Sequence, residues 1–172
     1  MLTCINDPAV IGSIIETRSV AQENSMFKHI LVPTDGSQLS LETVKRAVTF
    51  AREAGAKITF FFAKPDYPVA FYGEGALIDP TTPEKFAEMA DRQAQEILAN
   101  ASAVAKEAGV PSANTDSVSD LPYQAIIDAA NNAGCDLIFM ASHGRRGFSG
   151  LLLGSETQKV LTHSTIPVLV YR

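Results

Sequence analysis

Two short segments of this chain carry the residue types from which a site for a charged ligand can be built. The first is Pro33-Thr34-Asp35-Gly36-Ser37, which follows an apolar run and holds one carboxylate. The second is Ala141-Ser142-His143-Gly144, which is followed by nine residues and then by Gly154-Ser155. Glycines let a backbone approach a ligand closely or take a positive φ, and a helix start offers unpaired N–H groups to an anion. The spacing therefore indicates a phosphate-binding loop with the Ser155 hydroxyl as a further donor.

Each of these residues also has a purely structural interpretation. Ser155 is a typical N-cap, and Asp35 is a typical turn residue before a helix. With a ligand present, Asp35 would accept hydrogen bonds from a ribose or help to hold Mg²⁺ that phosphates carry in. Arg145 and Arg146 either screen a phosphate chain or are solvated loop residues. His143 lies in the glycine loop without a nucleophile and an orienting acid in recognisable spacing, so it is assigned no catalytic role.

Alternating strand-like and helix-like segments must position these two loops. Strands are predicted at residues 29–32, 57–63, 115–118, 136–141 and 167–171, and helices at 37–54, 83–108, 122–133 and 155–163. Strands separated by helices imply βαβ crossovers and a mainly parallel sheet with helices on both faces. Ligands of such sheets bind beyond the carboxyl ends of the strands, which is where both loops fall.

Periodicity and caps support the two longer helices. The first has Leu41, Val44, Val48 and Ala51 on one face and ends at Gly55. The second begins at Thr82-Pro83, a cap followed by proline at the first helical position. Its apolar stripe consists of Phe86, Ala90, Ala94, Ile97, Ala101, Val104 and Ala108. The segment 64–82 between strand and helix is rich in proline and glycine and is predicted to be a loop.

The chain has 172 residues, which suits one domain at residues 26–172. Residues 1–25 show no lasting period and are predicted to be a disordered arm or the product of a wrongly assigned start, with a docking helix near 11–17 as the alternative. Cys4 and Cys135 are too few for a disulfide framework, and Cys135 is predicted to be a core residue. The three histidines lie far apart, without the spacing of a zinc site.

Charge and hydropathy exclude several classes of partner. The net charge is −5, and the sequence gives no sign of the basic face that a sequence-independent nucleic-acid binder uses. No stretch reaches the ~18 apolar residues that span a bilayer. The N-terminus lacks the basic and then apolar layout of a secretory signal. We therefore expect a cytoplasmic protein that binds neither nucleic acid nor membrane.

Three motifs, taken together, match a known family. They are ILVPTDGS at 30–37, ASHGRRGFSGLLLGS at 141–155 and IPVLVYR at 166–172. From Met26 to Arg172 the sequence resembles the universal stress protein family. The motif of its nucleotide-binding members is glycine, two residues, glycine, nine residues, glycine, then serine or threonine. Gly144 and Gly154-Ser155 keep this spacing, whereas Ala141 replaces the first glycine; one added methyl group is expected to weaken binding at worst.

The resemblance implies a single open five-stranded parallel sheet of order 3-2-1-4-5, an adenine nucleotide alpha-hydrolase-like (Rossmann-like) α/β fold. It also implies bound ATP, or ADP or AMP, with Mg²⁺, and a homodimer through the last strand, Val168–Tyr171. Asp35 would contact the ribose, the backbone at Ala63 the adenine edge, and backbone groups near Gly144 and Gly154 the phosphates. The candidate nucleotide-binding residues are Pro33, Thr34, Asp35, Ala63, Ala141, His143, Gly144, Arg145, Gly154, Ser155 and Glu156.

Three functions are consistent with these features. The leading hypothesis is a stress-response regulatory protein that binds ATP. A dimeric interaction module that has lost nucleotide binding is the alternative that Ala141 keeps open. An ATP hydrolase is the third; against it, the loop has no Walker lysine and the chain shows no general base placed for an attacking water.

Overall fold

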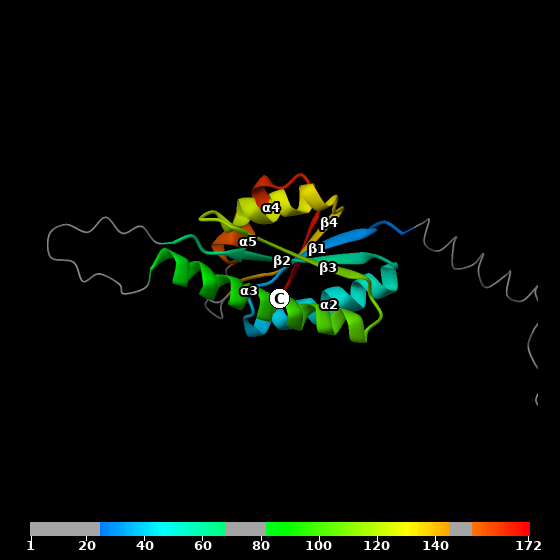
Figure 1. Cartoon of the computed structure of the whole chain (residues 1–172). Coiled ribbons are helices and arrows are strands. Elements are labelled where there is room, and N and C mark those ends of the chain that lie inside the picture. The colour runs from blue at the N-terminus through cyan, green and yellow to red at the C-terminus, as the bar shows by residue number, and fades with distance from the viewer. Residues whose placement is uncertain (1–24, 68–81, 145–152) are drawn as a thin grey trace, which may run out of the picture.

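The computed structural model describes residues 25–67, 82–144 and 153–172, in which strands and helices alternate as predicted (Figure 1). The strands are β1 (His29–Pro33), β2 (Lys57–Lys64), β3 (Ser112–Val118), β4 (Leu137–Ala141) and β5 (Val168–Tyr171). The helices are α2 (Gln38–Ala54), α3 (Pro83–Glu107), α4 (Pro122–Ala133) and α5 (Ser155–His163). The predicted N-terminal extension falls, up to residue 24, outside the described residues.

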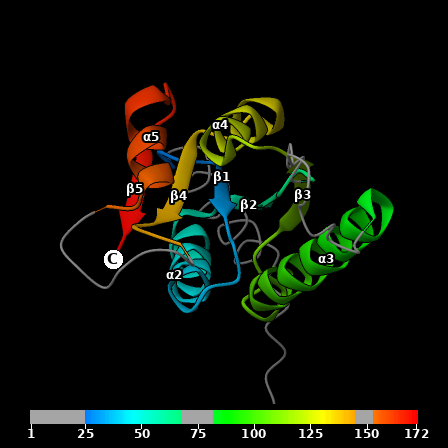
Figure 2. The same ribbon diagram turned by 90° about the vertical axis from the view of Figure 1, so that its left-hand side faces the viewer.

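The five strands form one parallel sheet in the order β3-β2-β1-β4-β5, which confirms the predicted fold. Helices α2 and α3 cover one face, and α4 and α5 cover the other (Figures 1 and 2). From β1 the chain winds outward through β2 to β3, and it then returns to the other side of β1 to form β4 and β5. The winding direction therefore reverses between β1 and β4, where open parallel sheets form a ligand crevice.

The central strands are buried on both faces, as their apolar runs predict. In β1, Ile30 and Val32 pack into the cluster shared with α2 and α3, while Leu31 packs into the cluster shared with α4 and α5; all three are 0% exposed. In β2, Phe60 and Phe61 divide in the same way. The site is thus mounted on strands that cannot shift without disturbing both layers.

Strand β3 is longer than predicted, because it begins at Ser112 rather than at residue 115. Its sequence, SANTDSV, has no apolar run, and most of its residues are exposed. Backbone pairing with β2, from Ile58–Ser112 to Lys64–Val118, holds it at the edge of the sheet. Edge strands depend less on side-chain burial than central ones, so hydrophobicity alone did not predict that residues 112–114 belong to the strand.

The helix faces differ in part from the predicted stripes. In α2, Val44, Val48 and Ala51 are buried as predicted, but Leu41 is only half-buried, and Ser40 and Thr43 are buried in its place. In α3, Phe86, Val104 and Ala108 are half-buried, while Leu98 and Ala105 lie in the core. The buried hydroxyls of α2 belong to its first turns, next to the loop after β1, where local hydrogen bonds satisfy them.

The ends of the helices follow their sequence signals. Ser37 caps α2 by accepting from Ser40 N, and Thr82 caps α3 by accepting from Lys85 N. Gly55 ends α2 with φ of 68°, a left-handed conformation that favours glycine. Cys135 is buried, as predicted, and this burial raises the pKa of its thiol to about 11. None of the described helices combines the length and apolar character that a membrane crossing requires.

A buried histidine at the start of β1 makes stability sensitive to pH. His29 is 8% exposed, and its Nε2 lies 2.8 Å from Thr59 Oγ1. Burial, and then the nearby Lys57 charge, lower the pKa of His29 from 6.5, against an opposing effect of Asp136. Below about pH 6.5 the unfolded chain therefore binds a proton that the folded chain resists, so the free energy of unfolding decreases as pH falls.

We expect His29→Gln to flatten this dependence. Urea unfolding of both proteins from about pH 7.5 to about pH 5.5 measures it, since the glutamine can still hydrogen-bond to Thr59 but does not titrate in this range. A variant that loses stability on acidification as steeply as the wild type would show that other groups are responsible.

Candidate functional site

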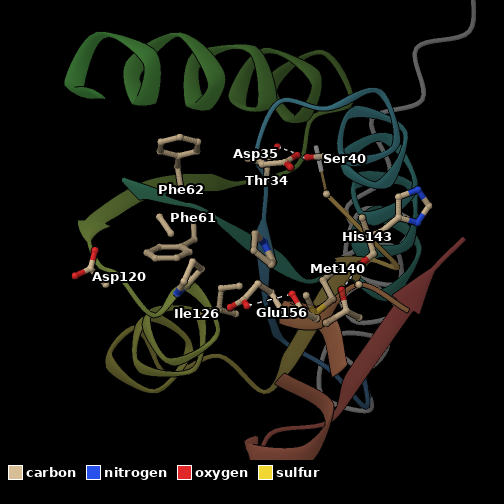
Figure 3. A pocket seen from close by; sticks show the side chains of 18 residues that line it. Thr34, Asp35, Ser40, Phe61, Phe62, Asp120, Ile126, Met140, His143 and Glu156 are labelled. Atoms are coloured by element: carbon tan, nitrogen blue, oxygen red, sulfur yellow. Dashed lines mark hydrogen bonds between the residues drawn. The ribbon is translucent and has the colours of Figure 1, made fainter. Parts of the chain in front are cut away.

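A cavity of about 550 Å³ opens at the carboxyl ends of β1, β2 and β4, at the point where the winding reverses (Figure 3). The structure places ten predicted site residues in its lining: Pro33, Thr34, Asp35, Ala63, Ala141, His143, Gly144, Gly154, Ser155 and Glu156. Arg145, the eleventh, lies outside the described residues. The fold thus brings the two loops together, although their contact with a nucleotide stays a prediction.

Eight lining residues were not among the predicted ones. They are Ser40, Phe61, Phe62, Asp120, Pro122, Ile126, Met140 and Thr157. Some of them were predictable, because Phe61, Phe62 and Met140 lie near the carboxyl ends of predicted strands. Asp120 follows β3 in the same sense, so the rule that directed attention to the other two loops applied to it as well.

Hydrogen bonds within the loop after β1, and from it to β2 and α2, hold this loop in place. Thr34 N donates to Phe61 O at 2.9 Å, and Thr34 Oγ1 lies 2.6 Å from Ser40 Oγ, which also accepts from Asp35 N at 3.1 Å. Asp35 Oδ1 accepts from Ser37 N at 3.0 Å. The turn-shaping interpretation of Asp35 is therefore confirmed. A ribose contact is compatible with it, since a carboxylate can accept several hydrogen bonds.

Two glycines of the second loop are favoured by close approach rather than by a positive φ. A Cβ at Gly144 would lie 2.5 Å from Asp35 Oδ2, and one at Gly154 would lie 3.1 Å from His143 Cα. Neither glycine is among the described residues with positive φ. Gly144 thus lets the second loop come directly against Asp35, and Gly154 lets the start of α5 come against the end of the loop.

The start of α5 is the part of the cavity best suited to an anion. Its N-cap is Gly154, so the interpretation of Ser155 as the N-cap is wrong; Ser155 is the first helical residue. No side chain of the described residues caps this end, and the helix's first hydrogen bond runs from Gln158 N to Gly154 O. The N–H groups before Gln158, together with the helix dipole, favour a negative charge here.

Glu156 lies at the same helix start, but its carboxylate is engaged elsewhere. Oε2 accepts from Tyr123 N at 2.9 Å, at the beginning of α4, where the N-cap Leu121 supplies no side-chain acceptor. Oε1 accepts from Lys159 Nζ at 3.0 Å. The side chain thus joins the starts of the two helices, and a phosphate contact by this residue would come from its backbone N–H.

The backbone of Ala63 points past the end of β1. Phe61 O accepts from Thr34 N, so the peptide groups of Phe61 face β1. Backbone groups two residues apart on a strand face the same neighbour. Because the pairing of β1 with β2 ends at Pro33–Phe61, no strand of the described residues lies opposite the N–H and C=O of Ala63, and this residue lines the cavity.

Buried apolar side chains complete the wall. Phe61 from β2, Ile126 from α4 and Met140 from β4 are 1%, 6% and 5% exposed and line the cavity (Figure 3). A cavity with apolar walls and a few fixed polar groups is typical of a small-molecule site.

Ala141 and His143 are placed without strain. Ala141 ends β4, and its carbonyl accepts from Thr157 Oγ1 at 3.0 Å; the described residues include no positive φ outside glycine, so this backbone does not require one. His143 Nδ1 lies 3.1 Å from Ser142 Oγ. The backbone at Ala141, the first motif position, therefore does not require a glycine.

Fold and site together define a doubly wound α/β protein with a pocket at the switch point of its sheet. The sequence pattern of the Universal stress protein family matches residues 26–172. Universal stress protein MJ0531 of Methanocaldococcus jannaschii is 32% identical over 149 residues, which cover 86% of this chain and 84% of that protein. Universal stress protein YxiE of Bacillus subtilis is 31% identical over 151 residues, 86% of this chain and 100% of that one.

A solved structure described as a universal stress protein in complex with cAMP matches this chain with a TM-score of 0.63 and 27% sequence identity. The match covers 86% of this chain and 99% of that chain. The chain belongs to the universal stress protein family.

Proposed function

We propose that this protein binds an adenine nucleotide, ATP in the first place, in the cavity at the switch point, and that it acts as a regulatory protein of the stress response in the cytoplasm. The observation that carries the proposal is the start of α5, which has no side-chain cap among the described residues and lines a cavity that the buried side chains of Phe61, Ile126 and Met140 wall in part. The cAMP complex of a related protein supports the choice of an adenine nucleotide.

The residues fit the parts of a nucleotide in order along the cavity. Backbone N–H groups of Gly144, Ser155 and Glu156 would hold the phosphates, while Gly154, whose own N–H donates to Ser142 O, would let the phosphates approach the start of α5. Asp35 would accept from the ribose hydroxyls or hold Mg²⁺ bound to the phosphates, and Pro33 and Thr34 would support it. Arg145 would screen the phosphate charge, and His143 would lie along the phosphate chain. The exposed N–H and C=O of Ala63 would pair with the adenine edge.

A homodimer through β5 belongs to the same proposal. The strand is the last in the sheet order, and all four of its residues are half-buried. An edge strand of this kind, Val168–Tyr171, is a template for pairing with a second copy.

The alternative without nucleotide binding rests on Ala141, and the geometry at that residue weakens it. The alanine occupies regular strand backbone, and its carbonyl is bonded to Thr157. Its one methyl group is therefore a local addition to the cavity wall rather than a distortion of it.

The test is mass spectrometry of nucleotide released from freshly purified protein, with calorimetric titration of Mg-ATP into wild type and Asp35→Ala. We expect bound adenine nucleotide and measurable affinity in the wild type. Loss of hydrogen bonds to the ribose should weaken binding roughly tenfold in Asp35→Ala. No released nucleotide and no heat of binding at millimolar ATP would overturn the proposal in favour of an interaction module.

A further inference from the structure

The two ends of the cavity differ in polarity. One end holds the start of α5 and His143, and the other holds Asp120; Figure 3 shows Asp120 and His143 at opposite ends. Helix N–H groups attract an anion, whereas a carboxylate attracts hydrogen-bond donors and repels a phosphate. A nucleotide bound here has its phosphates at α5 and therefore its base toward Asp120.

Asp120 is positioned by the pairing of β2 with β3. Ala63 pairs with Ser117 and Lys64 with Val118, and Ser119 N then donates to Lys64 O at 3.0 Å. Asp120 is the next residue, so it follows directly on the end of the β2–β3 pairing. Asp120 and Ala63 both line the cavity, so this end of it is formed by the residues at the carboxyl ends of β2 and β3.

Asp120 also differs from the other two carboxylates that line the cavity. Asp35 accepts from Ser37 N, and Glu156 accepts from Tyr123 N and Lys159 Nζ. Asp120 is exposed, and among the residues that the structure describes no hydrogen bond or ion pair engages its carboxylate. A negative acceptor at the base end, held by no group in this part of the chain, is available to an amino group of a ligand.

We propose that Asp120 is a specificity-determining residue that selects adenine over guanine by accepting a hydrogen bond from the exocyclic N6 amino group. This inference rests on the proposed nucleotide binding. The amino group has two hydrogens, one for the carbonyl of Ala63 and one for Asp120, while Ala63 N–H pairs with the ring nitrogen N1. Guanine carries an acceptor, O6, at the position of N6, and a carboxylate repels it.

The experiment is a calorimetric comparison of Mg-ATP, Mg-GTP and the Mg complex of purine riboside triphosphate, which has a hydrogen in place of the N6 amino group, on wild type, Asp120→Asn and Asp120→Ala. Asparagine is neutral and can accept or donate, so we expect Asp120→Asn to reduce the ATP-to-GTP affinity ratio roughly tenfold; the discrimination that remains comes from Ala63, whose N–H and C=O would face the N1–H and O6 of guanine. Asp120→Ala should weaken ATP binding but leave the binding of purine riboside triphosphate unchanged, because that nucleotide has no amino group to lose.

Asp128→Asn is the matched control, since Asp128 is an exposed acid of α4 that accepts from Gln124 and does not line the cavity. It should leave the ATP-to-GTP ratio unchanged. Equal changes for ATP and GTP in Asp120→Asn would show that Asp120 acts only through general charge, and they would overturn the inference while nucleotide binding stands. Absence of binding of all three nucleotides to the wild type would overturn both.

Discussion

Gly154→Val is expected to lower the affinity for Mg-ATP at least ~100-fold, about 3 kcal/mol of binding free energy. A Cβ at this position would lie 3.1 Å from His143 Cα, 3.2 Å from His143 Cβ and 3.4 Å from Ser142 O. Two of these three atoms are backbone, so no side-chain rotation relieves the contact, and the two methyl groups of valine enlarge it. We therefore expect the start of α5 to shift away from the loop and to weaken the hydrogen bond from Gly154 N to Ser142 O, which is 2.8 Å long.

The backbone of Gly154 itself is not the reason for this effect, because φ of −62° and ψ of 151° are open to any residue. Gly134→Ala is the matched control: a Cβ there meets nothing within 4 Å, but φ is 65°. That variant should lose about 1 kcal/mol of folding stability and keep its affinity for ATP. Thermal melts establish that both variants fold, and calorimetry measures the affinities; unchanged binding in a folded Gly154→Val would contradict the assignment of the phosphate site.

Ser40→Ala is expected to cost ~1–3 kcal/mol of folding stability and to weaken ATP binding as well. The Ser40 side chain is 2% exposed, lies 2.6 Å from the hydroxyl of the buried Thr34, and accepts from Asp35 N. Alanine leaves two buried polar groups of the loop without this partner. The loop that holds Asp35 then loses the bonds that fix its backbone, so a residue that lines the cavity affects both the fold and the site.

Thr43→Val provides the contrast on the same helix. Thr43 is 0% exposed, and its Oγ1 donates to Leu39 O at 2.7 Å. In a regular helix the same carbonyl also accepts the backbone N–H four residues on, so it keeps a partner when the hydroxyl is removed. Valine keeps the volume, so the stability loss should be smaller than that of Ser40→Ala, and ATP affinity should not change. Urea unfolding and calorimetry of the two variants measure the difference; equal effects on affinity would show that the Ser40 bonds do not position the loop.

How far the sequence could predict the site depends on the residue. Glycine-serine at 154–155 correctly marked the start of a helix and the edge of a cavity, because caps and glycines act locally. The helix was predicted to begin at Ser155, as observed; only the alternative in which Ser155 is the N-cap is wrong, since the N-cap is the glycine and no side-chain hydrogen bond caps this end. Asp120 was missed although the strand-end rule applied to it, because the predicted strand before it is polar and no glycine beside it indicates a binding loop.

Local chemistry determined the elements of this protein. The apolar run of β1, the glycine that ends α2 and the Thr82-Pro83 start of α3 each act within a few residues, and all three were predicted from the chain alone. The order of the strands came from the resemblance to a family and was confirmed by the structure.

Only the tertiary structure decided what these elements do to one another. Segments that lie far apart in the sequence meet where Gly144 contacts Asp35 and where Tyr123 N donates to Glu156. The peptide groups of Ala63 lie at the cavity because the pairing of β1 with β2 ends at Phe61. Such contacts depend on which strands pair and in what register, and neither the periodicity nor the composition of one segment specifies its partner. The sequence thus supplies the residue types of the site, while the pairing of β1 with β2 and β4 sets the distances between those residues.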